Sequence, residues 1–112
     1  MIGVKYGLIP KENFCSYFNF LIDKTYKILP LKEENSSTLK SYLESFLREL
    51  IGNQKLIALL VDEPQFISVL NIMQFLIAEE YPVSVCKKEV FKCIHILGEI
   101  KNKYFKGGDF NG

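Results

Sequence analysis

The sequence predicts an all-α fold, a single-domain bundle or orthogonal array of about five helices. The 112 residues suit one domain, and the hydrophobic share of 48% and the charged share of 24% lie near globular averages. Segments with apolar residues at helical spacing cover most of the chain, and proline, glycine or capping residues separate them. No repeat or long linker divides the chain, so we expect residues 1–112 to form one helical domain with residues 107–112 as a flexible tail.

The first ten residues lead into the first expected helix. Apolar residues alternate with glycine or lysine over residues 2–8, a period of two that fits either a short strand or an extended arm. Pro10 can begin a helix because the first turn does not need its missing N–H, and its fixed φ angle suits a helix. The helix should run over residues 11–29 and end before Pro30, which disfavours the α conformation at the residue preceding it.

The second expected helix has the clearest pattern in the chain. Residues 32–37 are polar and form a surface connection, and Ser36 or Ser37 is expected to cap the helix that follows. Apolar residues then recur at one-sided helical spacing, at Leu39, Tyr42, Leu43, Phe46, Leu47, Leu50 and Ile51. Gly52 is expected to lie just past the end of this helix, and the middle of the apolar stripe should lie in the core.

Two more helices are expected before residue 82. Asn53 can cap a short helix over residues 54–61. Two acidic residues and Pro64 then mark a new helix start, since a carboxylate accepts the first N–H groups and proline is tolerated in the first turn. This fourth helix should extend to about Glu80 and end before Pro82.

A fifth helix is expected near the end of the chain. Residues 83–86 favour β structure because they include two valines, and they could pair with the N-terminal arm. The helix should cover residues 87–106 and stop at Gly107 and Gly108. Its apolar side carries Val90, Cys93, Ile94, Leu97, Ile100 and Tyr104. The helix is therefore amphipathic, and its other side should face water or a partner.

The polar side of the fifth helix carries four lysines that we name the basic face. At about 100° per residue, they gather with His95 and Glu99 on one side, at Lys88, Lys92, Lys103 and Lys106. The basic face is either an ordinary solvated surface, a phosphate-binding surface or a surface for an acidic protein. A net charge of only +1 gives no strong overall field, so nucleic acid is a less favoured partner than protein.

The fourth helix carries no charge between Glu63 and Glu79 and is apolar almost all round. It is therefore a central core helix, an interface with a protein partner or second copy, or an interfacial membrane helix, being too short to cross a bilayer. The helical projection places an apolar set on the inward side, at Phe66, Ile67, Val69, Leu70, Met73, Leu76 and Ile77. On the other side, we expect a partner to be bound by Ile72, Phe75, Ser68 and Asn71.

The sequence contains no recognisable catalytic, cofactor or metal motif. His95 is the only histidine, which excludes paired-histidine zinc sites, and no glycine-rich phosphate loop is present. Cys86 lies beside two lysines and is the one thiol whose pKa could be lowered, although a small buried side chain is the more ordinary role. We expect no enzyme activity, no cofactor and no small-molecule substrate, and keep a thiol enzyme using Cys86 as an alternative.

The remaining observations concern the class of protein. Three cysteines at unpaired spacing indicate reduced thiols and a cytoplasmic protein, without a transmembrane segment or a signal peptide. Abundant lysine, isoleucine and asparagine indicate an A/T-rich genome, such as that of a low-GC bacterium or its phage. The size, the helical pattern and the lack of catalytic residues are similar to those of bacteriocin immunity proteins, and equally fit phage-encoded inhibitors and helical accessory subunits. We therefore expect a non-catalytic module that binds a protein partner or self-associates, with nucleic-acid binding as the alternative.

Overall fold

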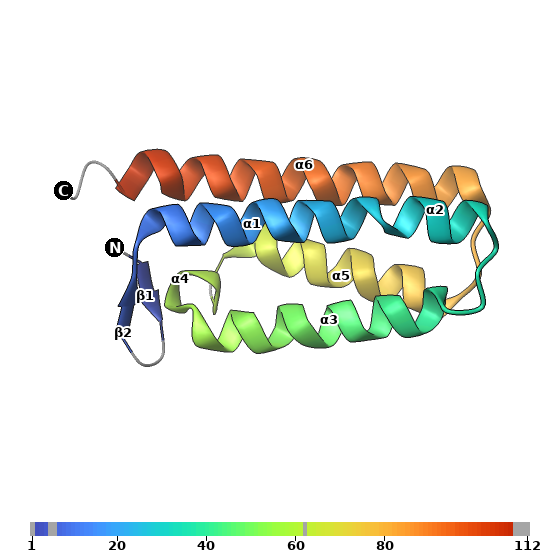
Figure 1. Ribbon diagram of the computed structural model, residues 1–112, viewed down its shortest axis with the longest axis horizontal. Helices are drawn as coiled ribbons and strands as arrows, with labels where there is room; N and C mark the ends of the chain where they lie inside the picture. The colour runs from blue at the N-terminus through green and yellow to red at the C-terminus, as the bar shows by residue number, and fades with distance from the viewer. Residues whose placement is uncertain (1, 5–6, 62, 109–112) are drawn as a thin grey trace.

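The computed structural model is a helical bundle with four antiparallel legs, each of which is one helix or two helices in line. It measures 46 × 23 × 20 Å (Figure 1). It describes the backbone of residues 2–4, 7–61 and 63–108, and the side chains of residues 10–57, 60–61 and 63–103. The elements are β1 (Ile2–Val4), β2 (Gly7–Ile9), α1 (Lys11–Tyr26), α2 (Ile28–Glu33), α3 (Leu39–Leu56), α4 (Ala58–Val61), α5 (Pro64–Ala78) and α6 (Val83–Gly108). The prediction of an all-α single domain is confirmed, in its bundle form.

The legs follow one another in simple antiparallel order. The helices α1 and α2 run in line as the first leg, α3 returns, α5 runs back, and α6 spans the length of the molecule (Figure 1). The helix α6 packs against α1, α2 and α5, while α3 packs against α5 and α4. The connections α2–α3 and α5–α6 lie together at the end away from the two termini (Figure 1).

The N-terminal segment forms a small hairpin. The strands β1 and β2 pair antiparallel, with Ile2 opposite Ile9 and Val4 opposite Gly7. The hairpin also contacts α4. Strand structure at the N-terminus was one of the two expected forms. The pairing with residues 83–86, which the sequence left open, does not form, because those residues are helical and belong to α6.

The first leg breaks earlier than the sequence predicts. The helix α1 ends at Tyr26, not at residue 29, and α2 continues through Pro30. Proline has no N–H to donate to the carbonyl four residues earlier, and its ring clashes with that carbonyl. The break therefore falls at Tyr26 and Lys27, four and three residues before the proline. Pro30 is then the third residue of α2, where a missing N–H is tolerated.

The turn after α2 is stabilised by backbone hydrogen bonds. Asn35 has a φ of 51°, a left-handed conformation that asparagine tolerates better than most residues. The N–H of Ser36 donates to the carbonyl of Leu31 at 2.9 Å, which completes a Schellman motif. The helix α3 then begins after Thr38, one or two residues later than predicted. The Oγ of Ser36 accepts the Thr38 N–H at 3.2 Å and so orders the approach to α3.

The helix α3 does not end at Gly52. It continues through Gly52 and Asn53 to Leu56, and only the short α4 remains of the predicted helix over residues 54–61. The side chain of Asn53 does not cap a helix, because its amide donates to the hydroxyl of Tyr17 on α1. No local sequence pattern reveals this contact between α3 and α1. It lies beside Gly52, which is inside α3 and does not end the helix.

Replacing Gly52 by alanine is expected to stabilise the protein by about 0.5–1 kcal/mol, because glycine loses more backbone entropy in a helix than alanine does. A Cβ atom at this exposed position would meet no atom within 4 Å. Urea denaturation measures the change in the free energy of unfolding. Gly98→Ala in α6, where the Cβ position is also open, should shift stability in the same direction. A loss of stability in Gly52→Ala would contradict a helical backbone at this residue.

The helices α5 and α6 both begin at a proline, α5 with Pro64 and α6 directly after Pro82. The Glu63 carboxylate caps α5, so the helix starts at Pro64, one residue later than the predicted order of an acidic cap followed by an acidic first turn, and it ends at Ala78. The helix α6 starts after Pro82, whose carbonyl accepts the N–H of Val85 at 3.1 Å. Helix formation over residues 83–86 places Cys86 on the buried side of α6, so tertiary burial outweighs the weak β preference of valine. The helix includes both expected stop glycines, and residues 109–112 of the expected tail lie outside the described residues.

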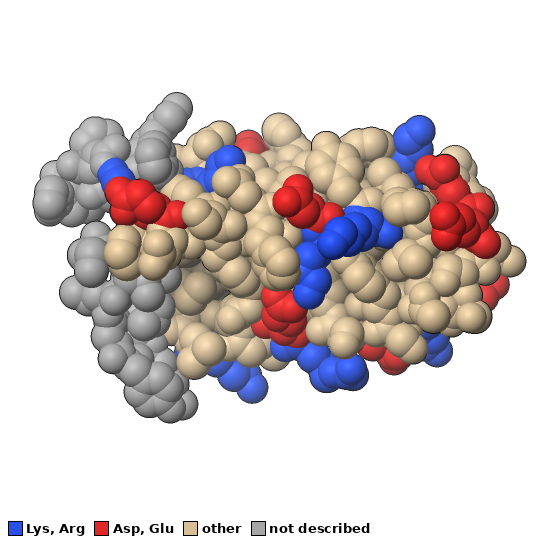
Figure 2. All heavy atoms as spheres, viewed as in Figure 1, with Lys and Arg blue, Asp and Glu red and all other residues tan. Residues whose placement is uncertain are grey.

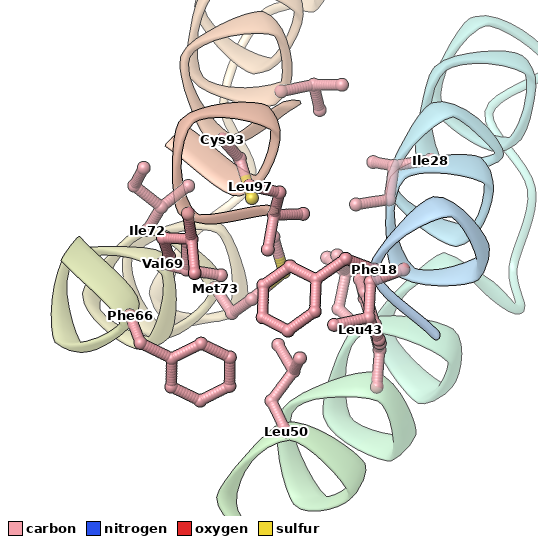
Figure 3. Packing of buried hydrophobic residues seen from close by; sticks show 14 of the residues in the cluster. Phe18, Ile28, Leu43, Leu50, Phe66, Val69, Ile72, Met73, Cys93 and Leu97 are labelled. Atoms are coloured by element: carbon pink, nitrogen blue, oxygen red, sulfur yellow. The ribbon is translucent and has the colours of Figure 1, made fainter. Parts of the chain in front are cut away.

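The core lies along the axis of the bundle. Figure 3 shows Phe18 of α1, Leu50 of α3, Met73 of α5 and Leu97 of α6 pointing towards one another. All four side chains are fully buried. Among the described residues, every buried side-chain nitrogen or oxygen has a hydrogen-bond partner. The predicted core positions Leu43, Phe46 and Leu50 are buried, which confirms the apolar stripe of α3.

Candidate functional site

The rotation of α5 differs from the one that the sequence predicts. Ile72, expected as an exposed partner-binding residue, is only 6% exposed and belongs to the core. Conversely, Ile67 was expected inside and is 41% exposed. The helix lies between α3 and α6, so it must bury the sides that face both neighbours. Because α5 is apolar almost all round, its own pattern does not determine which side that is.

The four predicted partner-binding residues nevertheless lie together. They line an open groove of about 290 Å³ between α5 and α6, formed by Ser68, Asn71, Ile72 and Phe75 of α5 and Glu89, Lys92 and Ile96 of α6. The buried Ile72 and the half-buried Ile96 supply apolar side chains, while Ser68, Asn71, Phe75 and Lys92 are exposed. The groove thus joins the predicted partner-binding residues to one lysine of the basic face.

Sequence reasoning missed Glu89 and Ile96 as groove residues. The available signal was their position at the edge of the apolar side of α6, three or four residues from Lys92. Only the packing of α5 against α6 shows that this edge meets Phe75.

Phe75 is the principal exposed apolar side chain of the groove. It is 40% exposed, and its ring stacks on Tyr81 with centroids 4.3 Å apart and planes 12° apart. The Oγ of Ser68 donates to the carbonyl of Pro64 at 3.2 Å, so this hydroxyl already has a partner within its own helix. A stacked aromatic ring loses little freedom on binding, which favours Phe75 as a contact residue.

The charges in the groove are balanced. Glu89 and Lys92 lie three residues apart on α6, and α5 adds no charged residue to the lining. In the described part of the chain, neither residue takes part in an ion pair. Some other charged side chains of the bundle are paired, such as Lys24 with Glu49 across α1 and α3 at 2.6 Å. The groove therefore presents one carboxylate and one ammonium group to whatever binds there.

The basic face is less uniform than its sequence pattern. Lys88 and Lys92 are exposed, but the ammonium of Lys103 lies 2.7 Å from the buried Glu63 carboxylate. The other oxygen of that carboxylate accepts the N–H of Gln65 at 3.1 Å, so Lys103 helps to neutralise the cap of α5. The side chain of Lys106 lies outside the described residues.

The surroundings of the basic face carry charges of both signs. The Nε2 of His95 lies 3.5 Å from the Glu99 carboxylate, which also accepts a hydrogen bond from the side chain of Gln65 at 3.2 Å. On the face seen in Figure 2, acidic and basic side chains are interspersed and no region of one sign covers it. On this face, the described residues form no continuous basic stripe of the kind that phosphate binding favours.

A second cavity, which the sequence did not reveal, lies at the end of the bundle where the α2–α3 and α5–α6 connections meet. It measures about 330 Å³, and its lining includes Lys32, Lys40, Glu79, Tyr81 and Cys86. Burial raises the pKa of the Cys86 thiol, while nearby Lys32 acts in the opposite direction. Cys86 is a small buried side chain, the more ordinary of its two expected roles, and the alternative of a lowered pKa is wrong because burial outweighs the attraction of the cation.

The other two thiols behave alike. Burial raises the pKa of Cys93 to about 12 and also raises the pKa of Cys15.

In the described part of the chain, no three histidine, cysteine or acidic side chains gather where they could share a metal ion. The described helices include none with the length and apolarity needed to cross a bilayer. Comparisons with protein-family models, with curated proteins and with solved structures found no match.

Proposed function

We propose that this protein is a non-catalytic helical interaction module, and that the groove between α5 and α6 receives a helix of another polypeptide. The observation that carries the proposal is the groove itself, which joins an exposed aromatic side chain, Phe75, to the buried Ile72 and the half-buried Ile96. Aromatic side chains at such positions supply much of the binding energy in protein interfaces. Polar and charged residues around them, here Asn71 and Lys92, form the usual rim.

The shape of the groove favours a helix as the occupant. Its lining residues recur at helical spacing along two neighbouring helices, Ser68 to Phe75 on α5 and Glu89 to Ile96 on α6. Seven residues of helix correspond to about 10 Å, so the lining extends over two turns of each helix. An amphipathic helix laid into such a groove packs as the neighbouring legs of the bundle pack on one another.

An accessory, inhibitor or immunity-type role fits a module that acts by binding alone. The codon preference inferred from composition supports a low-GC bacterium or its phage as the source. The three cysteines are free thiols, which supports a reducing compartment such as the cytoplasm.

The test compares Phe75→Ser with Phe91→Ser in affinity capture from extracts of the producing cells. Phe91 is a matched control because it is 43% exposed, lies outside the groove and also contacts an aromatic ring, that of Tyr26. We expect Phe75→Ser to weaken protein binding more than tenfold and Phe91→Ser to leave it nearly unchanged. Thermal melts of both variants verify that the fold is intact.

Two results would contradict the proposal. Equal capture by wild type and Phe75→Ser would show that the groove does not bind. Capture of nucleic acid that falls steeply with salt and is weakened by Lys88→Gln would instead identify the basic face as the functional surface.

A further inference from the structure

We infer that the occupant of the α5/α6 groove is a second copy of this chain, with the two copies related by a two-fold axis that crosses α6 between Glu89 and Lys92. The inference rests on the proposed function of the groove and names its partner. In such a dimer the same surface of both copies forms the interface, so every contact is made twice.

The first argument is the order of residues on the groove side of α6. At spacings of three or four residues this side carries Val85, Glu89, Lys92 and Ile96, all on one face of the helix. The series is symmetric about its centre, with an apolar residue at each end and opposite charges between them. When two such helices pack antiparallel, Glu89 of each copy meets Lys92 of the other, and Val85 meets Ile96.

The second argument is that these charges have no partner in the described part of the chain. No ion pair involves Glu89 or Lys92, although Lys92 is exposed and Glu89 is half-buried. A groove with one charge of each sign offers no net attraction to a strongly acidic or strongly basic partner. A second copy presents the same two charges in reversed order, which is the complementary arrangement.

The third argument is the position of Phe75 near the proposed axis. The side chains of Gln65 and Glu99 are hydrogen-bonded at 3.2 Å, which sets the register of α5 against the antiparallel α6. Phe75 follows Gln65 by ten residues on α5, and Glu89 precedes Glu99 by ten residues on α6. Because the two helices are antiparallel, Phe75 and Glu89 lie at the same level, and both line the same groove. The exposed rings of the two copies would therefore meet at the centre of the interface, where aromatic contacts contribute most.

The like charges that two approaching copies bring together lie mainly on α6, which carries six lysines and two glutamates, so the contacts between Glu89 and Lys92 must offset this repulsion. The helix α5 has no charged residue between Glu63 and Glu79, so this helix brings no like charges together. The net charge of +1 produces only weak repulsion between whole molecules.

The test uses charge exchange in the intact chain, with association measured by sedimentation equilibrium. We expect wild type to dimerise, and Glu89→Lys and Lys92→Glu each to weaken dimerisation more than tenfold, because each single variant creates two like-charge contacts. A mixture of the two single variants should associate again, since both contacts then join opposite charges. The double variant, which carries both changes, should dimerise by itself.

The control is Lys87→Glu, which changes the same charge at an exposed lysine on the side of α6 away from Glu89 and Lys92 and should leave dimerisation nearly unchanged. Circular dichroism verifies that each variant is folded, as expected for substitutions on the surface. A dimer that responds to neither exchange, or whose single variants fail to associate when mixed, would overturn the inference.

A monomeric wild type would also overturn it, and Phe75→Ser then separates the two proposals. If the capture of another protein still depends on Phe75, the groove binds a different partner and the proposed function stands. If capture does not depend on Phe75, both proposals fail.

Discussion

Replacing Phe46 by alanine is expected to destabilise the folded protein by about 3–5 kcal/mol. The side chain is buried in the middle of α3, and the Lys24 ammonium lies 5.4 Å from its ring centre. Alanine removes the buried ring and leaves a cavity that the surrounding helices can only partly fill. Because a domain of this size is stable by only about 5–15 kcal/mol, much of the total would be lost.

Urea denaturation followed by circular dichroism measures this change, and α3 also supplies a matched pair of leucines. Leu50 is fully buried, whereas Leu56 on the same helix is 40% exposed. Leu50→Ala should cost about 2–5 kcal/mol, and Leu56→Ala less than about 1 kcal/mol. Equal costs at the two leucines, or a cost below about 0.5 kcal/mol at Phe46, would mean that this face of α3 is not buried.

Replacing Ile72 by serine is expected to destabilise the fold by at least about 3 kcal/mol, through loss of a buried aliphatic side chain and burial of a hydroxyl group. Ile72 is in the core, between α5 and α6, and only its edge reaches the groove. The matched control is Ile67→Ser on the same helix, where the side chain is exposed and the cost should stay below about 1 kcal/mol.

Thermal melts and sedimentation of the two isoleucine variants together distinguish the observed rotation of α5, with Ile72 buried, from the predicted one, with Ile72 exposed. A large fall in melting temperature for Ile72→Ser, with little change for Ile67→Ser, agrees with the structure. The reverse result, with Ile72→Ser stable but unable to associate, would support the rotation that the sequence pattern alone predicts.

Local sequence patterns predicted helices well wherever polar and apolar residues alternate with helical period. The stripe of α3 and the buried side of α6, with Val90, Cys93, Leu97 and Ile100, are both as expected. These residues could be identified because an amphipathic helix has one side that can be buried without burying charge. The start of α5 was also predictable to within one residue, since capping depends on neighbouring residues only.

The candidate site was predictable only in part. Phe75, Ser68 and Asn71 do reach the α5/α6 groove, but Ile72 is mainly a core residue. The role of Lys103 could not be foreseen either, because its partner, Glu63, precedes it by 40 residues. Contacts between residues so far apart depend on how the legs pack, and a helical projection of one segment does not contain that information.

The sequence by itself determined the helical class, the starts of α1 and α5 to within about one residue and the buried side of each amphipathic helix, because these follow from local spacing and capping. Tertiary structure decided three things: the rotation of α5, the continuation of α3 through Gly52, and the helical form of residues 83–86. In each case the local preference is small, on the order of 1 kcal/mol or less, or absent. Burial of a whole helix side against its neighbours contributes several times more, so packing selects the conformation and creates the groove.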